Sequence, residues 1–155
     1  LTPTCWWVDL HVTESPLKLV DFVLLQLKFD TTLPQQDEEA DPVVRLSRPS
    51  LDLDFSIGVD SEESGFRLEV TIATTTSPDS PGYHFSVTGA GFFSIDSGAG
   101  RKDREKLLIH SGIPMVINSL RMAVAAVTGF GLYGKLLFDS IDLSALLEQK
   151  RSADS

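Results

Sequence analysis

The residues of this chain that could do chemistry are few and scattered. The segment GFGLYGK at 129–135 has the G-x-G-x-x-G spacing of dinucleotide-binding loops. In such loops the glycines let the backbone approach a pyrophosphate, and the motif follows a strand and opens a helix. Here a helical pattern precedes it. We therefore expect a helix end and a flexible turn at 129–135, and no nucleotide cofactor.

Metal binding and catalysis find equally little support. His11, His84 and His110 do not have the spacing of metal ligands. Asp52 and Asp54 are two residues apart, and paired carboxylates can do acid–base work. The solvated outer face of a strand explains this pair more simply. No G-x-S-x-G motif is present. The sequence thus predicts a protein that is not an enzyme and that holds no metal.

Composition narrows the classes of partner. The chain has 155 residues, 42% of them hydrophobic, and a net charge of −9. This predicts a globular domain and argues against nucleic acid and against anionic membrane surfaces, which attract clusters of Lys and Arg. The single cysteine, Cys5, fits a reducing cytoplasm. The most apolar segments, 17–29 and 111–131, contain charges, so we expect no membrane insertion.

Period-two alternation predicts four strands, each with one buried face. The expected inward-facing residues are, strand by strand, Val23, Leu25, Leu27 and Phe29; Leu51, Leu53, Phe55, Ile57 and Val59; Phe66, Leu68, Val70 and Ile72; and Tyr83, Phe85, Val87, Phe93 and Ile95. Gly89 and Gly91 interrupt the last strand, which indicates a bulge or a close-packed neighbour. Short turns at 61–65 and 76–82 predict that the last three strands form a meander.

The remaining pattern is helical. It predicts a short helix at 101–110, an apolar helix within 111–131 entered through Pro114, and a last helix at 142–151 capped by Asp142. The expected fold class is α+β, a four-stranded antiparallel sheet of Greek-key or meander type followed by helices on one face. We expect a single domain, 1–155, with an N-terminal extension (1–16), a long loop (31–50) and a flexible tail (152–155).

The apolar helix has an unusually small polar face. Between 115 and 128, the polar residues Asn118, Arg121 and Thr128 fall within roughly an 80° arc. A helix that rests on one sheet needs an apolar stripe of only about 100°. A second surface must therefore cover this helix, either the rest of its own chain or another subunit.

An ordered set of segments resembles the SecB family of protein-export chaperones. The set comprises LQLKFDTTLP, LDLDFSI, FRLEVTIAT, GAGFFSI, GIPMVINSLR and IDLSALL, and it spans 21–147. The resemblance implies a homotetramer, a dimer of dimers, whose long helices are sandwiched between sheets of different subunits. The corresponding candidate interface residues are Met115, Leu120, Met122, Ala125 and Ala126.

The resemblance also implies a function without chemistry. Family members are holdases that bind unfolded polypeptides in hydrophobic surface grooves without ATP. The matching groove positions are Leu51, Leu53, Phe55 and Leu147. Core-facing strand residues have the same pattern, so the sequence leaves both interpretations open for each position.

One departure concerns the translocase motor SecA, which the family binds through acidic residues on the outer face of the sheet. Asp30 matches one such position, whereas Gln26 and Ser86 stand at two others. We therefore expect weak SecA binding at most. The alternatives are a SecB-like chaperone dedicated to another client, such as an antitoxin, and a binding protein for a small lipid-like molecule.

Overall fold

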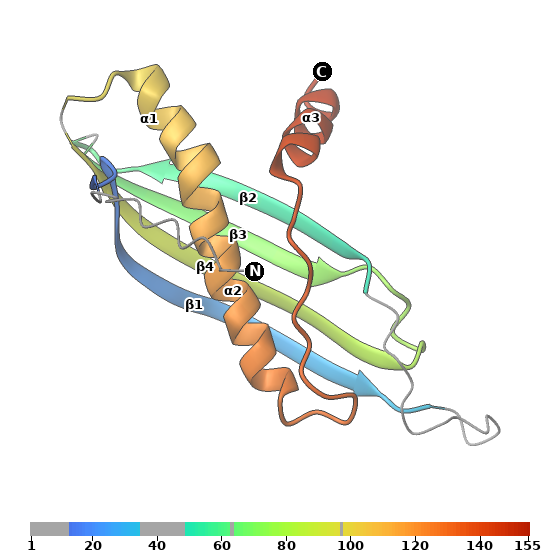
Figure 1. Cartoon of the computed structure of the whole chain (residues 1–155). Coiled ribbons are helices and arrows are strands. Elements are labelled where there is room, and N and C mark those ends of the chain that lie inside the picture. Colours follow the sequence, from blue (N-terminus) through green and yellow to red (C-terminus); the bar gives the residue numbers. More distant parts are fainter. Residues whose placement is uncertain (1–12, 35–48, 63, 97) are drawn as a thin grey trace, which may run out of the picture.

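A computed structural model describes residues 13–34, 49–62, 64–96 and 98–155. Four antiparallel strands form one sheet in the order β1-β4-β3-β2. Their bounds are β1 Leu17–Thr32, β2 Leu51–Val59, β3 Gly65–Thr74 and β4 Gly82–Ile95. The helical elements α1 (Arg101–Leu107), η1 (Leu108–Gly112) and α2 (Ile113–Thr128) follow and cross one face of the sheet (Figure 1). The predicted α+β class, meander and Greek-key order are confirmed.

The inward-facing residues of β3 and β4 are those predicted, and all but Ile95 are buried. On β2, Leu51, Leu53 and Phe55 are half-buried against the core, while Ile57 and Val59 are exposed. Most of the predicted long loop, most of the N-terminal extension, Cys5 and His11 lie outside the described residues.

The prediction for β1 is wrong in part. The pairing of β1 with β4 shifts between Leu19 and Asp21 and again between Leu24 and Gln26. Each bulge adds one residue to β1 and so reverses which side chains point inward. As a result Phe22 packs against the core, whereas Val23 and Leu25 are 39% and 47% exposed.

The two helices expected at 101–110 and 111–131 are one continuous helix. Its middle is the π-helical turn η1, in which the N–H of Ile113 donates to the carbonyl of Leu108. Gly112 keeps helical angles, so the helix is not interrupted before α2. Pro114 has no N–H to offer the preceding turn, which coincides with this change of hydrogen-bond pattern. Asp142 caps α3 (Leu143–Ala153) as predicted, but the helix extends into the expected tail.

By length and composition alone, the 28-residue helix Arg101–Thr128 could cross a membrane, since its most apolar window has a mean hydropathy of 1.3. In the fold it lies on the sheet, with Val116, Leu120 and Val124 almost fully buried. Helices that cover the core of a sheet have the same composition. The absence of membrane insertion therefore stays a prediction.

Gly89 and Gly91 let α2 approach β4 closely. A Cβ on Gly89 would lie 2.7 Å from Cζ of Phe22 and 2.8 Å from a methyl carbon of Leu120. A Cβ on Gly91 would lie 2.7 Å from both Phe93 and Val116. The predicted close-packed neighbour of these glycines is thus the helix.

The segment 132–142, which has no regular secondary structure, covers a second side of α2. Leu136 and Phe138 are buried, and the N–H of Leu136 donates to Oγ1 of Thr128 at 2.8 Å. Nε of Arg121 donates to the carbonyl of Phe138 at 2.7 Å. Two of the three residues in the predicted polar arc therefore bind the chain's own backbone instead of facing water.

The turn between β2 and β3 is closed by Asp60. Its carboxylate accepts hydrogen bonds from the N–H groups of Gly65, at 2.9 Å, and Ser64, at 3.0 Å. These bonds, that from Gly65 first, lower the pKa of Asp60 below its ordinary value. The exposed carboxylate of Asp60 thus stabilises the turn between β2 and β3.

Candidate client-binding groove

The residues singled out for chemistry have structural roles. Segment 129–135 follows α2 and forms turns that are closed by hydrogen bonds from the N–H groups of Gly131 and Gly134. The φ of Gly134 is 81°. Asp52 and Asp54 accept the N–H groups of the residues that follow them, at 3.0 and 2.9 Å. Nε2 of His84 lies 2.8 Å from the carbonyl of Ser80. Within the described ranges, no group of three or more His, Cys, Asp or Glu side chains could hold a metal ion.

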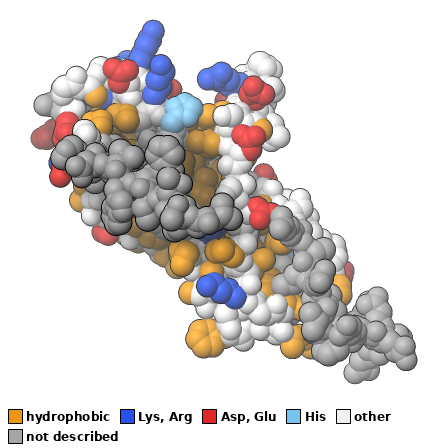
Figure 2. Space-filling model, in the orientation of Figure 1, with side chains coloured by type: hydrophobic (Ala, Val, Ile, Leu, Met, Phe, Trp, Pro, Cys, Tyr) orange, Lys and Arg blue, Asp and Glu red, His pale blue; other side chains and the backbone are white. Residues whose placement is uncertain are grey.

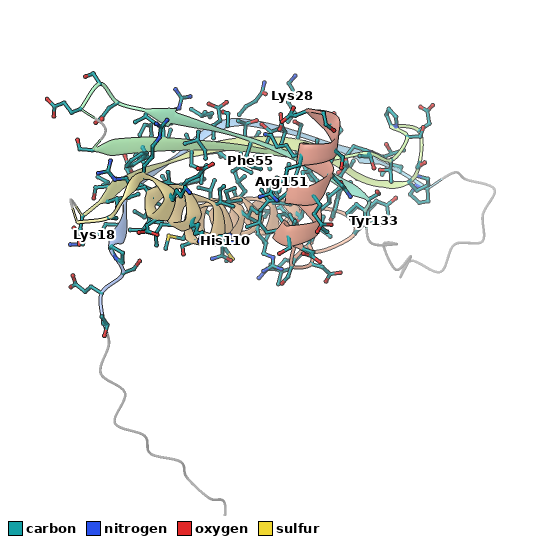
Figure 3. All side chains as sticks on the ribbon, turned by 90° about the horizontal axis from the view of Figure 1, so that it is seen from above. Lys18, Lys28, Phe55, His110, Tyr133 and Arg151 are labelled. Atoms are coloured by element: carbon teal, nitrogen blue, oxygen red, sulfur yellow. The ribbon has the colours of Figure 1, made fainter. Side chains whose placement is uncertain are left out.

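A groove of about 710 Å³ opens between β2, the α1–η1 helix and α3. Figure 2 shows hydrophobic side chains at the base of the groove and charged side chains on both of its sides, the long helix and α3. Figure 3 shows that Phe55, His110 and Arg151 come from three separate elements, the sheet, the long helix and α3. The apolar residues of the groove are Phe55, Ile57, Ile109 and Leu147. Such a base can hold hydrophobic side chains.

The charged rim differs from the chain as a whole. Its basic residues are Lys102, Lys106, Lys150 and Arg151, and its acidic residues are Glu105, Glu148 and Asp154. Although the chain as a whole has a net charge of −9, the rim of the groove carries side chains of both signs.

A second hollow, of about 350 Å³, continues the groove along β2. It shares Ile57 and Glu105 with the first and adds Val59, Phe66 and Leu108 as apolar lining. The two hollows together follow the β2 edge beside the long helix. An elongated apolar channel of this kind suits an extended chain better than a compact ligand.

The structure brings together two of the four predicted groove residues. Phe55 and Leu147 line the groove, from β2 and α3. Leu51 and Leu53 do not line it and instead pack against the core. Ile57 was predicted to share their face but not to form the site, and Ile109 and Lys150 were not singled out. The alternation on β2 could have indicated Ile57.

The candidate interface residues divide into two sets. Leu120 and Ala125 are buried in the chain's own core, so their assignment to a contact between subunits is corrected. Met115, Met122 and Ala126 are exposed. At 100° per residue these three fall within roughly a 40° arc, which is the side of α2 opposite the sheet. Among the described residues of α2, this stripe is exposed, as are Pro114 and Asn118.

The candidate SecA-docking positions lie on the outer face of the sheet. Asp30 is opposite His84, and Lys28 is opposite Ser86, on neighbouring strands. Asp30 and Gln26 are both exposed. With Lys28 between them, this part of the outer face presents the Asp30 carboxylate beside a cation.

The class that these features define is a SecB-like fold. One solved structure that it resembles is the SecB-like chaperone Rv1957 of Mycobacterium tuberculosis, in complex with a ChAD peptide from the Rv1956 HigA1 antitoxin. The two chains are 15% identical, with a TM-score of 0.56, and the match covers 81% of this chain and 90% of that one. At this identity the likeness establishes the fold alone.

A weaker likeness links the chain to a protein of unknown function from Streptococcus agalactiae. The identity is 12% and the TM-score 0.42, over 81% of this chain and 97% of that one. A TM-score of this size supports no structural argument. No protein-family model and no curated protein matches the chain.

Proposed function

We propose that this chain is a chaperone of the SecB family, which holds extended segments of unfolded polypeptides in the groove and acts by binding, not by catalysis. The observation that carries this proposal is the groove itself, where Phe55 and Leu147 both line an apolar base with a charged rim. The SecB-like fold supports it, as does a solved neighbour that binds a peptide. We place the protein in the cytoplasm.

Two clients fit the proposal, an export precursor and a dedicated partner such as an antitoxin. The outer sheet face favours the second, because Gln26 and Ser86 leave Asp30 without the acidic neighbours that SecA docking uses in the family. Complementary charge mainly governs encounter and register. We therefore propose that any SecA binding is weak.

The function is tested by mixing the protein with a chemically unfolded client during dilution from denaturant. Light scattering should show suppressed aggregation without any nucleotide, and calorimetry should detect binding of the unfolded client but not of the same client when folded. Equal binding of folded and unfolded forms would contradict a holdase, as would release of the client by ATP alone.

We further propose a homotetramer, in which the exposed stripe of Met115, Met122 and Ala126 contacts another subunit. Met122 is 54% exposed, so Met122→Arg should leave the protomer folded. At an apolar interface the new guanidinium would lack a partner and would disfavour association. Light scattering at micromolar concentration should show a tetramer for the unaltered chain and a smaller species for Met122→Arg.

The matched control is Ser140→Arg, which adds the same charge at an exposed position outside the stripe. Assembly of this variant should be unchanged. A monomeric unaltered chain would refute the homotetramer, and an intact tetramer of Met122→Arg would place the interface elsewhere.

A further inference from the structure

In the described part of the chain β2 is an edge strand that borders the groove, and the direction of its backbone N–H and C=O groups follows from the hairpin with β3. The N–H of Asp60 donates to the carbonyl of Gly65, and the N–H of Thr75 donates to the carbonyl of Ser50, both at 3.0 Å. Even-numbered residues of β2 therefore bond to β3. Because the pattern alternates, the N–H and C=O groups of Leu53, Phe55 and Ile57 point to the free edge.

The same odd-numbered residues carry the inward-facing side chains of β2. A strand laid along this edge would thus place every second side chain over the groove, beside Phe55 and Ile57. Backbone pairing and side-chain burial would occur together. This is the geometry by which extended peptides add to exposed sheet edges.

Part of this edge is already occupied by the chain's own side chains. Asp52 accepts the N–H of Leu53, and Asp54 accepts the N–H of Phe55. Nζ of Lys150 donates to the carbonyl of Phe55 at 2.7 Å. Among the described residues, none hydrogen-bonds to the outward groups of Ile57. The β2 edge is therefore capped at Leu53 and Phe55 and open at Ile57.

Lys150 makes three contacts with β2. Besides the carbonyl bond, its Nζ lies 3.2 Å from Oδ1 of Asp54 and 4.0 Å from the centroid of the Phe55 ring. Of the hydrogen bonds and ion pairs of described residues, those that join α3 to the sheet all pass through Lys150. Since α3 has no fully buried residue, this side chain is the main polar tie that holds it against the groove.

We propose that Lys150 is an intramolecular occupant of the β2 edge, and that an extended polypeptide strand displaces it when it pairs with β2 in the groove. The inference rests on the proposed function and specifies how the client is bound. The client strand starts at the open groups of Ile57 and takes the carbonyl of Phe55 from the ammonium group. Binding therefore releases α3 from its tie to the sheet.

The test compares Lys150→Met with Lys135→Met in the full chain. Both changes replace a lysine by methionine and remove one positive charge, but Lys135 is exposed and lies outside the groove. The probe is a short fluorescein-labelled peptide of alternating valine and threonine, and its affinity is measured by anisotropy. Lys150→Met should bind it about three- to tenfold more tightly than the unaltered chain, and Lys135→Met should bind it as the unaltered chain does.

Two further measurements separate edge pairing from simple hydrophobic contact. N-methylation of one alternate set of peptide residues, valines or threonines, should weaken binding strongly, and methylation of the other set should not, because one set alone donates to β2. In the unaltered chain, peptide binding should speed amide exchange in α3. In Lys150→Met, the exchange of α3 should be fast already and should not respond.

The possible results distinguish failure of the Lys150 displacement from failure of the proposed function. If the peptide binds but Lys150→Met is no tighter, or if both methylated sets bind alike, the displacement of Lys150 is refuted while the groove stands. The same holds if bound peptide slows exchange in α3. If neither the unaltered chain nor Lys150→Met binds the peptide or an unfolded client, the proposed function itself is refuted.

Discussion

A Phe55→Ala variant is expected to bind an unfolded client at least about tenfold more weakly than the unaltered chain while remaining folded. Phe55 lines the groove together with Leu147, and its ring contacts the ammonium group of Lys150. An aromatic side chain at the centre of a groove gives up more water-exposed apolar area to a bound chain than rim residues do. Its removal should therefore lower client affinity.

The cost in folding stability should be smaller. Truncating a fully buried Phe costs about 3–5 kcal/mol. Phe55 is only half-buried, so less packing is lost, and we expect about 1–2 kcal/mol after including the exposed contact with Lys150. Calorimetric melting and client affinity, measured on the same preparation, separate the two effects.

The matched control is Phe130→Ala. Phe130 is 98% exposed in the turn after α2 and lies outside the groove. The substitution removes the same aromatic ring as Phe55→Ala does. Client affinity of this variant should be unaltered. A badly destabilised Phe55→Ala whose folded fraction binds normally would assign Phe55 to the core and would remove the support for a client site on β2.

The sheet could be predicted because alternating apolar and polar residues in a strand show which side chains share a face. The pairing of β2 with β3 and of β3 with β4 has no register shift, so the inward faces of these strands follow from residue order. In β1 the alternation is reversed twice, and Val23 and Leu25 were placed on the wrong face. A bulge depends on pairing with the neighbouring strand, and nothing within β1 itself shows where β4 fixes the register.

The groove was harder to predict because it joins elements that are distant in sequence. Phe55 and Leu147 were found through a family resemblance, whereas the contact of Lys150 with Phe55 spans 95 residues. The direction in which α3 leaves the sheet decides that contact, and it depends on the packing of segment 132–142. Likewise, Ala125 and Leu120 share an apolar pattern with Met122, and only the position of the covering surfaces separates core from exposed stripe.

Gly89→Val is expected to lower the stability of the protein by about 3 kcal/mol or more, and to leave little folded protein if the unaltered chain is only marginally stable. The Cβ alone would lie within 2.8 Å of both Phe22 and Leu120, and two methyl groups would follow it. The helix cannot withdraw without exposing Leu120 and its buried neighbours. Crowding should therefore force β1 and α2 away from β4.

Strand propensity alone predicts the opposite result, since a valine in a strand is more favourable than a glycine by up to about 1 kcal/mol. The measurement is the urea midpoint of Gly89→Val against that of Gly98→Val, whose added Cβ would have no atom within 4 Å. Gly98→Val should unfold near the midpoint of the unaltered chain. If Gly89→Val were as stable as that control, α2 would not lie against β4 as closely as described, and the packing that positions the long helix beside the groove would need revision.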